Sequence, residues 1–345
     1  MKRILVTGAG GYIGTSLVPM LLERGYAVRA MDRFFFGQEL LPQTDRLELI
    51  HEDCRHIAPE HLEGVDGVID LVAVSNDPSG ELFEQATWQI NHEARVKCAQ
   101  LAREAGATRY VLPSSCSIYG FQDAGVVCDE THEINPLTTY AKANRAAEEG
   151  VLPLGDGDFN VIVLRQATVF GYSPRMRFDL AINGMTYGAW KTGKLPLLRD
   201  GTQYRPMVHV RDTAAAQIFM LEYEDASKVN GEIFNIGSRE NNYQLQPLAE
   251  TVRDNVAEVT NRSVEIEWYG EPDHRSYEVA FDKVEALGWK AKLRARDGVL
   301  EICKALESGE LDKTDRTITL QWYKNLEQWN RIVRETRMYE GMLDI

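Results

Sequence analysis

Short runs of β-branched and other apolar residues alternate with longer stretches of helical periodicity through the first half of the chain. The short runs predict strands over residues 3–7, 27–32, 47–51, 67–72, 109–114 and 161–165. The longer stretches predict helices over residues 12–24, 83–105 and 138–149. Strands and helices that alternate in this way are typical of an α/β fold, a doubly wound parallel sheet with helices on both faces.

The pattern changes after Phe170. Gly, Pro and Arg are scattered over residues 171–205, and an apolar passage over 207–219 and a run over 232–236 then predict a return to the sheet. From residue 242 onward the sequence predicts a smaller mixed α/β part that ends in a helix rich in aromatic residues. We interpret these aromatic side chains as packing residues or a subunit contact; they are Trp322, Tyr323 and Trp329.

The first predicted strand leads into a glycine-rich turn, Gly8-Ala9-Gly10-Gly11-Tyr12-Ile13-Gly14, and a helix follows. Gly8 permits a positive φ, Gly11 lets a pyrophosphate approach the backbone, and Gly14 lets the helix press on the strand. The free N–H groups at the helix start, around Tyr12 and Ile13, would face that pyrophosphate. The context predicts a dinucleotide-binding Rossmann part over residues 1–170, with a return segment at about 206–237, and a substrate-binding part over 171–205 and 238–345.

Asp32 ends the second predicted strand. A carboxylate at this place accepts hydrogen bonds from both ribose hydroxyls of an adenosine and repels a 2′-phosphate, so it favours NAD over NADP. The neighbouring Arg33 offers a guanidinium that could stack on adenine or meet a phosphate. An ordinary solvated charge at a strand end is the alternative interpretation of Asp32. We expect NAD as the cofactor.

Composition and charge narrow the classes of protein and partner. The 345 residues are 44% hydrophobic, and 38 Lys and Arg against 52 Asp and Glu give a net charge of -14, which argues against a nucleic-acid partner. The five cysteines form no C-x-x-C pair, and their odd number fits a reducing compartment and suggests no metal site. The brief apolar stretch after Lys2 and Arg3 does not resemble a signal peptide, and no apolar run reaches membrane-spanning length. We expect a cytoplasmic protein with no membrane contact.

Further short motifs follow the glycine turn in a consistent order. They are Glu52-Asp53-Cys54-Arg55, Leu71-Val72-Ala73, Asn91, Ser114-Ser115-Cys116-Ser117-Ile118-Tyr119-Gly120 and Arg205-Pro206-Met207-Val208-His209-Val210-Arg211-Asp212. With these motifs the chain resembles, over nearly its whole length, the extended short-chain dehydrogenase/reductase family of NAD-dependent nucleotide-sugar epimerases and dehydratases. The resemblance implies that Asp53 and Cys54 lie near the adenine, that residues 71–73 lie beside the nicotinamide ribose, and that Asn91 belongs to the cofactor site.

The same resemblance implies a catalytic hydroxyl at Ser115 and a catalytic tyrosine at Tyr140, which the family follows with a lysine four residues later. Here that position is Asn144, and the nearest lysine is Lys142. Residues four apart share a helix face, whereas residues two apart are about 200° apart around it, so Lys142 should point away from Tyr140. Asn144 can bond a ribose hydroxyl but cannot supply the charge that lowers a tyrosine pKa. We expect slow or altered chemistry, or a rearranged helix that admits Lys142.

The chemistry that the resemblance implies is hydride transfer at a sugar carbinol, with Tyr140 taking the hydroxyl proton and Ser115 holding the oxygen. Sugar 4,6-dehydratases carry an Asp-Glu pair after the serine, whereas this chain has Cys116 and Ser117. C4 epimerisation or C4 oxidation of a nucleotide-diphosphate sugar is therefore favoured over 4,6-dehydration. Cys116 is either a thiol acid/base or a buried, inert cysteine. A non-catalytic NAD-binding regulator is a further alternative, motivated by Asn144.

The substrate side must neutralise a diphosphate. Arg205 matches the family's phosphate-binding arginine, and Arg275 is a second candidate, with a surface ion pair as the alternative for either. We interpret His209 as a core or supporting histidine. Polar residues beyond the predicted strand ends would meet the sugar; they are Ser75, Asn76, Thr168 and Asn183. The resemblance also implies a homodimer through the predicted helices 83–105 and 138–149.

Overall fold

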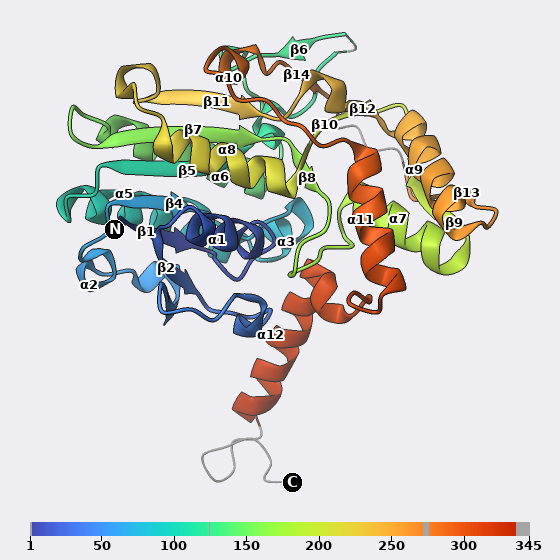
Figure 1. The fold of residues 1–345 in the computed structure, drawn as a ribbon, viewed down its shortest axis with the longest axis horizontal. Coiled ribbons are helices and arrows are strands. Elements are labelled where there is room, and N and C mark those ends of the chain that lie inside the picture. Colours follow the sequence, from blue (N-terminus) through green and yellow to red (C-terminus); the bar gives the residue numbers. More distant parts are fainter. Residues whose placement is uncertain (1, 124, 272–275, 336–345) are drawn as a thin grey trace.

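A seven-stranded parallel sheet forms the centre of the computed structural model, which describes residues 2–123, 125–271 and 276–335. Its strands are β11 (Glu232–Ile236), β7 (Asn160–Gln166), β5 (Arg109–Ser115), β4 (Gly67–Asp70), β1 (Arg3–Thr7), β2 (Ala27–Asp32) and β3 (Leu47–His51), in this spatial order. The chain builds outward from β1 to β3 and then crosses to β4 and continues to β11 (Figure 1). The carboxyl ends of β1 and β4 therefore border the crevice in which doubly wound sheets bind ligands.

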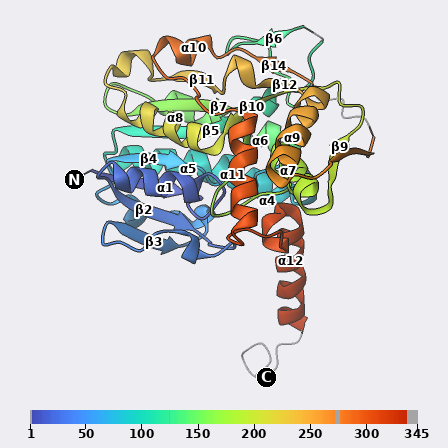
Figure 2. The same cartoon turned by 45° about the vertical axis from the view of Figure 1, so that its right-hand side comes forward.

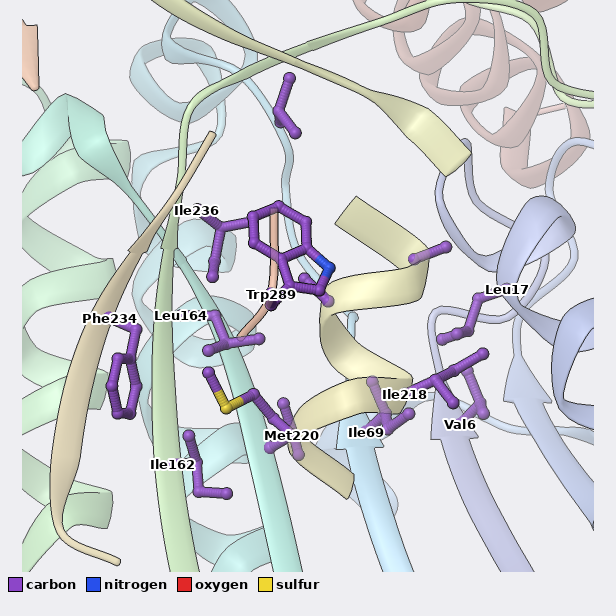
Figure 3. Close-up of a cluster of buried hydrophobic side chains, with 14 of the residues drawn as sticks. Val6, Leu17, Ile69, Ile162, Leu164, Ile218, Met220, Phe234, Ile236 and Trp289 are labelled. Atoms are coloured by element: carbon purple, nitrogen blue, oxygen red, sulfur yellow. The ribbon is translucent and has the colours of Figure 1, made fainter. Parts of the chain in front are cut away.

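Helices cover both faces of this sheet (Figures 1 and 2). They are α1 (Gly14–Glu23) and α8 (Val210–Glu222) on one face and α5 (Ala94–Glu104) and α6 (Thr139–Val151) on the other. Val6 of β1 joins Leu17 of α1 and Ile218 of α8 in one buried cluster (Figure 3), whereas its neighbour Leu5 joins Ala99 of α5 in a second. Because successive strand side chains point to opposite faces, one apolar strand supplies both cores. The predicted α/β fold class is confirmed.

The predicted strands agree closely with the structure, and one predicted helix does not. The strands over residues 3–7, 27–32 and 47–51 have the predicted bounds, and β4 ends at Asp70. The predicted helix 83–105 is interrupted: α4 (Glu84–Trp88) is followed by a π-helical turn, Gln89–Glu93, before α5 begins. The side chain of Asn91 in this turn bonds the backbone of Val74, with Val74 N–H donating at 2.8 Å and Val74 C=O accepting at 3.1 Å. The π-turn thus coincides with a side chain that ties the helix to the strand end.

The predicted return to the sheet at residues 207–219 is wrong in its pairing. This segment begins with β10 (Tyr204–His209), which pairs in parallel with β8 (Thr168–Phe170) and antiparallel with β12 (Asn242–Gln244) in a separate three-stranded sheet, and then becomes α8. Only β11 rejoins the main sheet, beside β7. The apolar run of β10 is buried like a central strand, so its sequence cannot distinguish one sheet from the other.

The later part of the chain surrounds a third buried cluster that includes Ile182, Leu195, Val252 and Val299. Its elements are α7 (Ala181–Thr192), β9 (Lys194–Leu198), α9 (Leu245–Thr260), β13 (Glu265–Tyr269) and α11 (Ala295–Glu307). The remaining elements are α2 (Pro59–Leu62), α3 (Asp77–Leu82), β6 (Val127–Cys128), β14 (Glu278–Val279), α10 (Asp282–Ala286) and α12 (Thr319–Glu335). The division into dinucleotide-binding and substrate-binding parts stays a prediction.

Helix α12 extends away from the body of the protein toward the C-terminus (Figures 1 and 2). Its first turns are anchored, because the Trp322 indole N–H donates to the Phe35 carbonyl at 2.7 Å and the Tyr323 ring contacts Phe36 and Phe83. Trp329 is exposed farther along. Among the described residues, no helix is both long and apolar enough to cross a bilayer.

Candidate active site

A cavity of about 1000 Å³ opens at the carboxyl ends of β1, β4 and β5, at the point where the strand order reverses. It brings together most of the residues predicted from the sequence. They are Gly8, Gly11, Tyr12, Ile13, Gly14, Asp32, Arg33, Asp53, Cys54, Leu71, Val72, Ala73, Ser75, Asn76, Ser115, Tyr140, Thr168 and Arg205. Residues that the motifs assigned to a dinucleotide and residues that they assigned to a sugar therefore line one continuous space.

The glycine turn leaves no room for side chains at its critical positions. Gly8 has φ +64°, and a Cβ there would lie 2.8 Å from the Val72 backbone. At Gly14 a Cβ would lie 2.4 Å from the Ala9 carbonyl oxygen, and at Gly11 it would lie 3.0 Å from that of Gly8. The start of α1 is thereby held against its own loop with its free N–H groups beside the cavity, which is the geometry that binds a pyrophosphate.

The acidic residue at the end of β2 is fixed by the loop. The Asp32 carboxylate accepts the N–H groups of Gly10 at 3.0 Å and Phe34 at 2.7 Å, and burial raises its pKa. Arg33 turns to Asp53 at 3.2 Å and lies over the Phe35 ring. Asp53 also binds Arg55 at 2.6 Å, and these hydrogen bonds lower its pKa to about 2. Arg33 therefore forms an ion pair with Asp53 at the edge of the cavity.

Sequence reasoning missed a buried arginine beside the glycine turn. Arg175 lies in the loop after β8, and its N–H donates to the Thr15 hydroxyl of α1 at 3.3 Å. Its Nη2 donates to Thr319 at 2.9 Å and its guanidinium stacks on Phe36, but its buried Nε and Nη1 have no hydrogen-bond partner within the described part of the chain. Burial and the charge of Arg177 lower the pKa of Arg175 to about 10. Two unpaired donor nitrogens on a buried cation fit an anionic group such as a pyrophosphate.

Arg177 and Tyr323 complete this wall of the cavity. Arg177 is buried and forms an ion pair with Asp179 at 2.7 Å. Tyr323 lies on α12, so its interpretation as a packing residue or subunit contact omitted its place in the cavity wall. The only sequence signal for the arginines is their alternation, Arg175-Met176-Arg177, directly after a Gly-Tyr-Ser-Pro turn.

Ser115 and Tyr140 meet across the cavity floor. Ser115 ends β5, and its hydroxyl accepts the Ser117 N–H at 3.1 Å. Tyr140 lies in the first turn of α6, which Thr138 caps by accepting the Ala141 N–H at 3.2 Å. Burial raises the pKa of the Tyr140 hydroxyl, whereas the charge of Arg95 and a hydrogen bond with Ser115 lower it. The arrangement can take a proton from a substrate hydroxyl held between the two oxygens.

The position of the expected lysine is buried beneath this pair. The Asn144 side chain donates to the Tyr140 carbonyl at 2.9 Å and accepts Nη1 of Arg95 at 2.8 Å. Lys142 is exposed, and α6 continues without a break through Val151. The helix is therefore not rearranged to admit Lys142. Asn144 bonds the backbone of Tyr140 and does not line the cavity.

Besides Asn144, three predicted site residues do not line the cavity. Asn91 uses its amide on the backbone of Val74, which lines the cavity, so its assignment to the cofactor site stays a prediction. Cys116 is wrong as a catalytic residue, because its thiol is buried, donates to the Arg165 carbonyl and has a pKa raised well above its usual range by burial. Asn183 is also buried, and it bonds the Gly171 N–H and the Tyr12 hydroxyl, so it positions Tyr12; its contact with the sugar stays a prediction.

Two predicted residues lie elsewhere. Arg275 falls outside the described residues. His209 is fully buried, its Nε2 lies 3.0 Å from Glu301, and burial lowers its pKa to about 4. The burial of His209 and its contact with Glu301 agree with the core or supporting histidine predicted from the sequence. Among the described residues, no group of three or more His, Cys, Asp and Glu side chains is arranged to hold a metal ion.

Comparison with known proteins agrees with this geometry. The sequence model of the NAD dependent epimerase/dehydratase family matches residues 4–237. The chain belongs to this family. The description of this family confirms the prediction of NAD as the cofactor, and the role of Asp32 in selecting NAD stays a prediction. The residues of the glycine turn, Asp32 and Arg175 are those that fit the cofactor.

Individual relatives are nucleotide-sugar enzymes. A putative UDP-arabinose 4-epimerase 4 of Arabidopsis thaliana is 27% identical over 270 residues, which cover 69% of this chain and 61% of the relative. UDP-glucuronic acid decarboxylase 1 of the same plant is 28% identical over 313 residues, 86% of this chain and 68% of the relative. The structure of MoeE5 in complex with UDP-glucuronic acid and NAD is 26% identical, with a TM-score of 0.77 over 89% of this chain and 99% of that one. The chain spans 61% and 64% of the length of two UDP-arabinose 4-epimerase relatives.

We expect Arg175→Met to weaken NAD binding by about tenfold to a hundredfold, the size of a lost charge-assisted hydrogen bond in a buried site. Calorimetric titration of the cofactor-free variant with NAD measures the change. Arg239→Met is the matched control, because the Arg239 side chain is 76% exposed and pairs with Asp282 outside the cavity. Equal affinities of the two variants would show that Arg175 only packs against Phe36.

Proposed function

We propose that the protein oxidises the C4 hydroxyl of a nucleotide-diphosphate sugar, as a C4 epimerase or a C4 dehydrogenase. The observation that carries this proposal is the Ser115–Tyr140 hydroxyl pair in the cavity that also holds the glycine turn. Bound NAD supplies the hydride acceptor. The names of the relatives, which include UDP-arabinose 4-epimerases and UDP-glucose 4-epimerases, support the reaction class and favour a UDP-sugar.

The chain's own residues divide the work on the carbinol. Tyr140 accepts the hydroxyl proton as the C4–H bond gives up its hydride, and Ser115 orients the same oxygen. The carbinol thereby loses one proton and one hydride and becomes a ketone. In an epimerase the hydride returns to C4 from the other face of this ketone and Tyr140 returns the proton to the oxygen, whereas a dehydrogenase releases the ketone.

The segment after Ser115 argues against dehydration. A 4,6-elimination needs an acid and a base beside the sugar, and this segment supplies a buried thiol at Cys116 and a hydroxyl at Ser117. The carboxylate of Asp77 lies in the cavity wall, where it accepts the Thr138 hydroxyl at 2.6 Å and raises the pKa of Tyr140. Asp77 is therefore engaged at the start of α6, close to the tyrosine.

The substrate end of the cavity contains Arg205, Ser75 and Thr168. Arg205 lies on β10, with its guanidinium 5.7 Å from the centre of the Tyr277 ring. Its position supports the assignment to a diphosphate, because a guanidinium binds phosphate oxygens in pairs. Ser75 lies beyond β4 and Thr168 at the start of β8, and both line the cavity that contains Ser115 and Tyr140, which supports their assignment to the sugar.

The test is to incubate the purified protein and its NAD with a panel of nucleotide sugars and to separate the products by chromatography and mass spectrometry. We expect at least one UDP-sugar to give its C4 epimer or its 4-ketone. A product lighter by one water would support the dehydratase alternative. Tight NAD binding with no turnover of any sugar would support the non-catalytic regulator instead.

A homodimer through the segments 83–105 and 138–149 is also part of the proposal, on the basis of the family resemblance. Light scattering during gel filtration measures the mass of the assembly directly. We expect twice the 39.0 kDa of the chain. A mass of one chain at micromolar concentration would contradict the dimer.

A further inference from the structure

The cation that opposes the burial of Tyr140 comes from a different helix than the family pattern predicts. Arg95 lies at the start of α5, directly after the π-helical turn, and is 2% exposed. Its Nη1 donates to Asn144 at 2.8 Å, and its Nε donates to the Val72 carbonyl at 2.9 Å. Both Arg95 and Val72 line the cavity that contains Tyr140. The guanidinium therefore connects the end of β4 to the helix of the catalytic tyrosine.

We propose that Arg95 supplies the positive charge beside Tyr140 that the family places four residues after this tyrosine, and that Asn144 positions its guanidinium. The inference rests on the proposed function, since it assigns a role within the same site. Arg95 is a positioning residue, because it acts on Tyr140 and not on the sugar. The positive charge thus comes from Arg95 on α5 and not from a lysine on α6, and the Asn144 side chain links the two helices through its hydrogen bond with Arg95.

The hydrogen bonds of Asn144 suit this role. Its Nδ2 donates to the Tyr140 carbonyl and its Oδ1 accepts from Arg95, so each end of the amide has a fixed partner. A lysine at position 144 would place a second cation against the buried guanidinium, which is costly in a site of low polarity. A neutral residue at position 144 thus avoids repulsion between two buried cations while Arg95 keeps its charge.

Besides Tyr140, the titratable groups that interact electrostatically with Arg95 are Asp70, Tyr110, Cys54 and Cys98. Among the described residues Arg95 forms no salt bridge. The buried carboxyl of Asp70 on β4 accepts the hydroxyl groups of Thr7 and Tyr110; burial raises its pKa, whereas the charge of Arg95 lowers it. The nearby thiols of Cys54 and Cys98 have raised pKa values and remain neutral.

The groups that face Tyr140 come from three elements and the loop between β8 and α7. Ser115 on β5 and the charges of Arg95 and Arg177 lower its pKa, and Asp77 on α3 raises it. Arg177 is already paired with Asp179, whereas Arg95 has no carboxylate partner in the described chain. Removing the charge at position 95 should therefore move the ionisation of Tyr140 to higher pH.

The test compares Arg95→Met, Asn144→Lys and the double variant Arg95→Met/Asn144→Lys. In Arg95→Met we expect the alkaline ionisation of Tyr140 and the rising limb of kcat against pH to shift upward by about 1 to 3 units. In the double variant, lysine at position 144 should bring both back toward the wild-type values. Asn144→Lys alone should give no increase in rate, because the charge is already present.

Two readouts separate this inference from the proposed function. Ultraviolet titration of tyrosinate, taken as the difference between each protein and its Tyr140→Phe counterpart, reports the ionisation without turnover. A shift in this titration with no sugar turned over would uphold the role of Arg95 and overturn the proposed function. Arg103→Met is the matched control on the same helix, because Arg103 is 48% exposed and pairs with Asp156 at 2.6 Å.

Two results would overturn the inference. The first is a lower kcat in Arg95→Met with an unshifted pH profile and no rescue by lysine at position 144, which is what a purely structural arginine predicts. The second is a large rate increase in Asn144→Lys alone, which would show that the site lacks a cation. If Arg95→Met does not fold, Asn144→Lys and the conservative variant Arg95→Lys provide the test. Arg95→Lys keeps the positive charge, so its pH profile should stay within about one pH unit of the wild-type profile.

Discussion

Replacing Tyr140 with Phe is expected to lower kcat by about 10²–10⁴-fold, the contribution of a positioned acid–base group. The change removes only the hydroxyl that bonds Ser115 and leaves the ring in the cavity wall. NAD binding and thermal unfolding should stay close to those of the wild type, since the backbone contact of Tyr140 with Asn144 is kept. Steady-state kinetics on the sugar identified by the panel give the change in kcat.

The matched control for this variant is Tyr323→Phe. Tyr323 also lines the cavity and has a pKa raised by burial, but it lies on α12 beside Phe36 and Phe83. We expect kcat to change by less than about threefold there, because a hydroxyl away from Ser115 has no proton to transfer. An equal loss of kcat in the two variants would mean that Tyr140 only lines the cavity and is not the base.

Replacing Glu148 with Leu is expected to destabilise the protein by about 3–5 kcal/mol, the cost of leaving a buried charge without its partner. Glu148 lies on α6 with a fully buried side chain, and it binds Arg165 of β7 at 2.9 Å. It also accepts the Ser114 hydroxyl at 2.6 Å, next to the catalytic serine. Loss of this carboxylate leaves the Arg165 guanidinium buried without its ion-pair partner, because the Arg165 side chain is only 2% exposed. Urea unfolding measures the change in the free energy of unfolding.

The neighbouring Glu149→Leu variant is the control. Glu149 is 60% exposed and pairs with Arg145 on the surface, so its replacement should cost no more than about 1 kcal/mol. The double variant Arg165→Met/Glu148→Leu should recover much of the lost stability, because both charges leave the core together. A loss in Glu148→Leu no larger than that in Glu149→Leu would show that the pair is not needed to hold α6 on the sheet.

The main sheet and its ligand crevice are predictable from local patterns, because buried parallel strands are short apolar runs and the glycine turn has one spacing. The pairing of β10 is not predictable in this way, since it depends on β8 and β12, which are distant in the sequence. The interruption of the helix 83–105 coincides with two hydrogen bonds between Asn91 and Val74. Patterns within one element carry no information on such contacts.

The site shows the same division. Ser115, Tyr140 and the glycines are found by motif, whereas Arg95 and Arg175 are found only in three dimensions. Arg95 reaches Asn144 across 49 positions of sequence, and Arg175 meets Thr319 across 144. The absence of the expected lysine is visible in the sequence, but its replacement by an arginine on another helix depends on how α5 packs against α6.

The central claim is that Tyr140 and Ser115 hold a C4 carbinol so that its hydride reaches the cofactor. The most direct test uses the nucleotide sugar identified by the panel, labelled with deuterium at C4, with samples quenched during turnover and the nicotinamide analysed by mass spectrometry. The account predicts deuterium on the reduced nicotinamide in the quenched samples, and its absence in Tyr140→Phe. Product that accumulates while no deuterium ever appears on the nicotinamide would contradict the account.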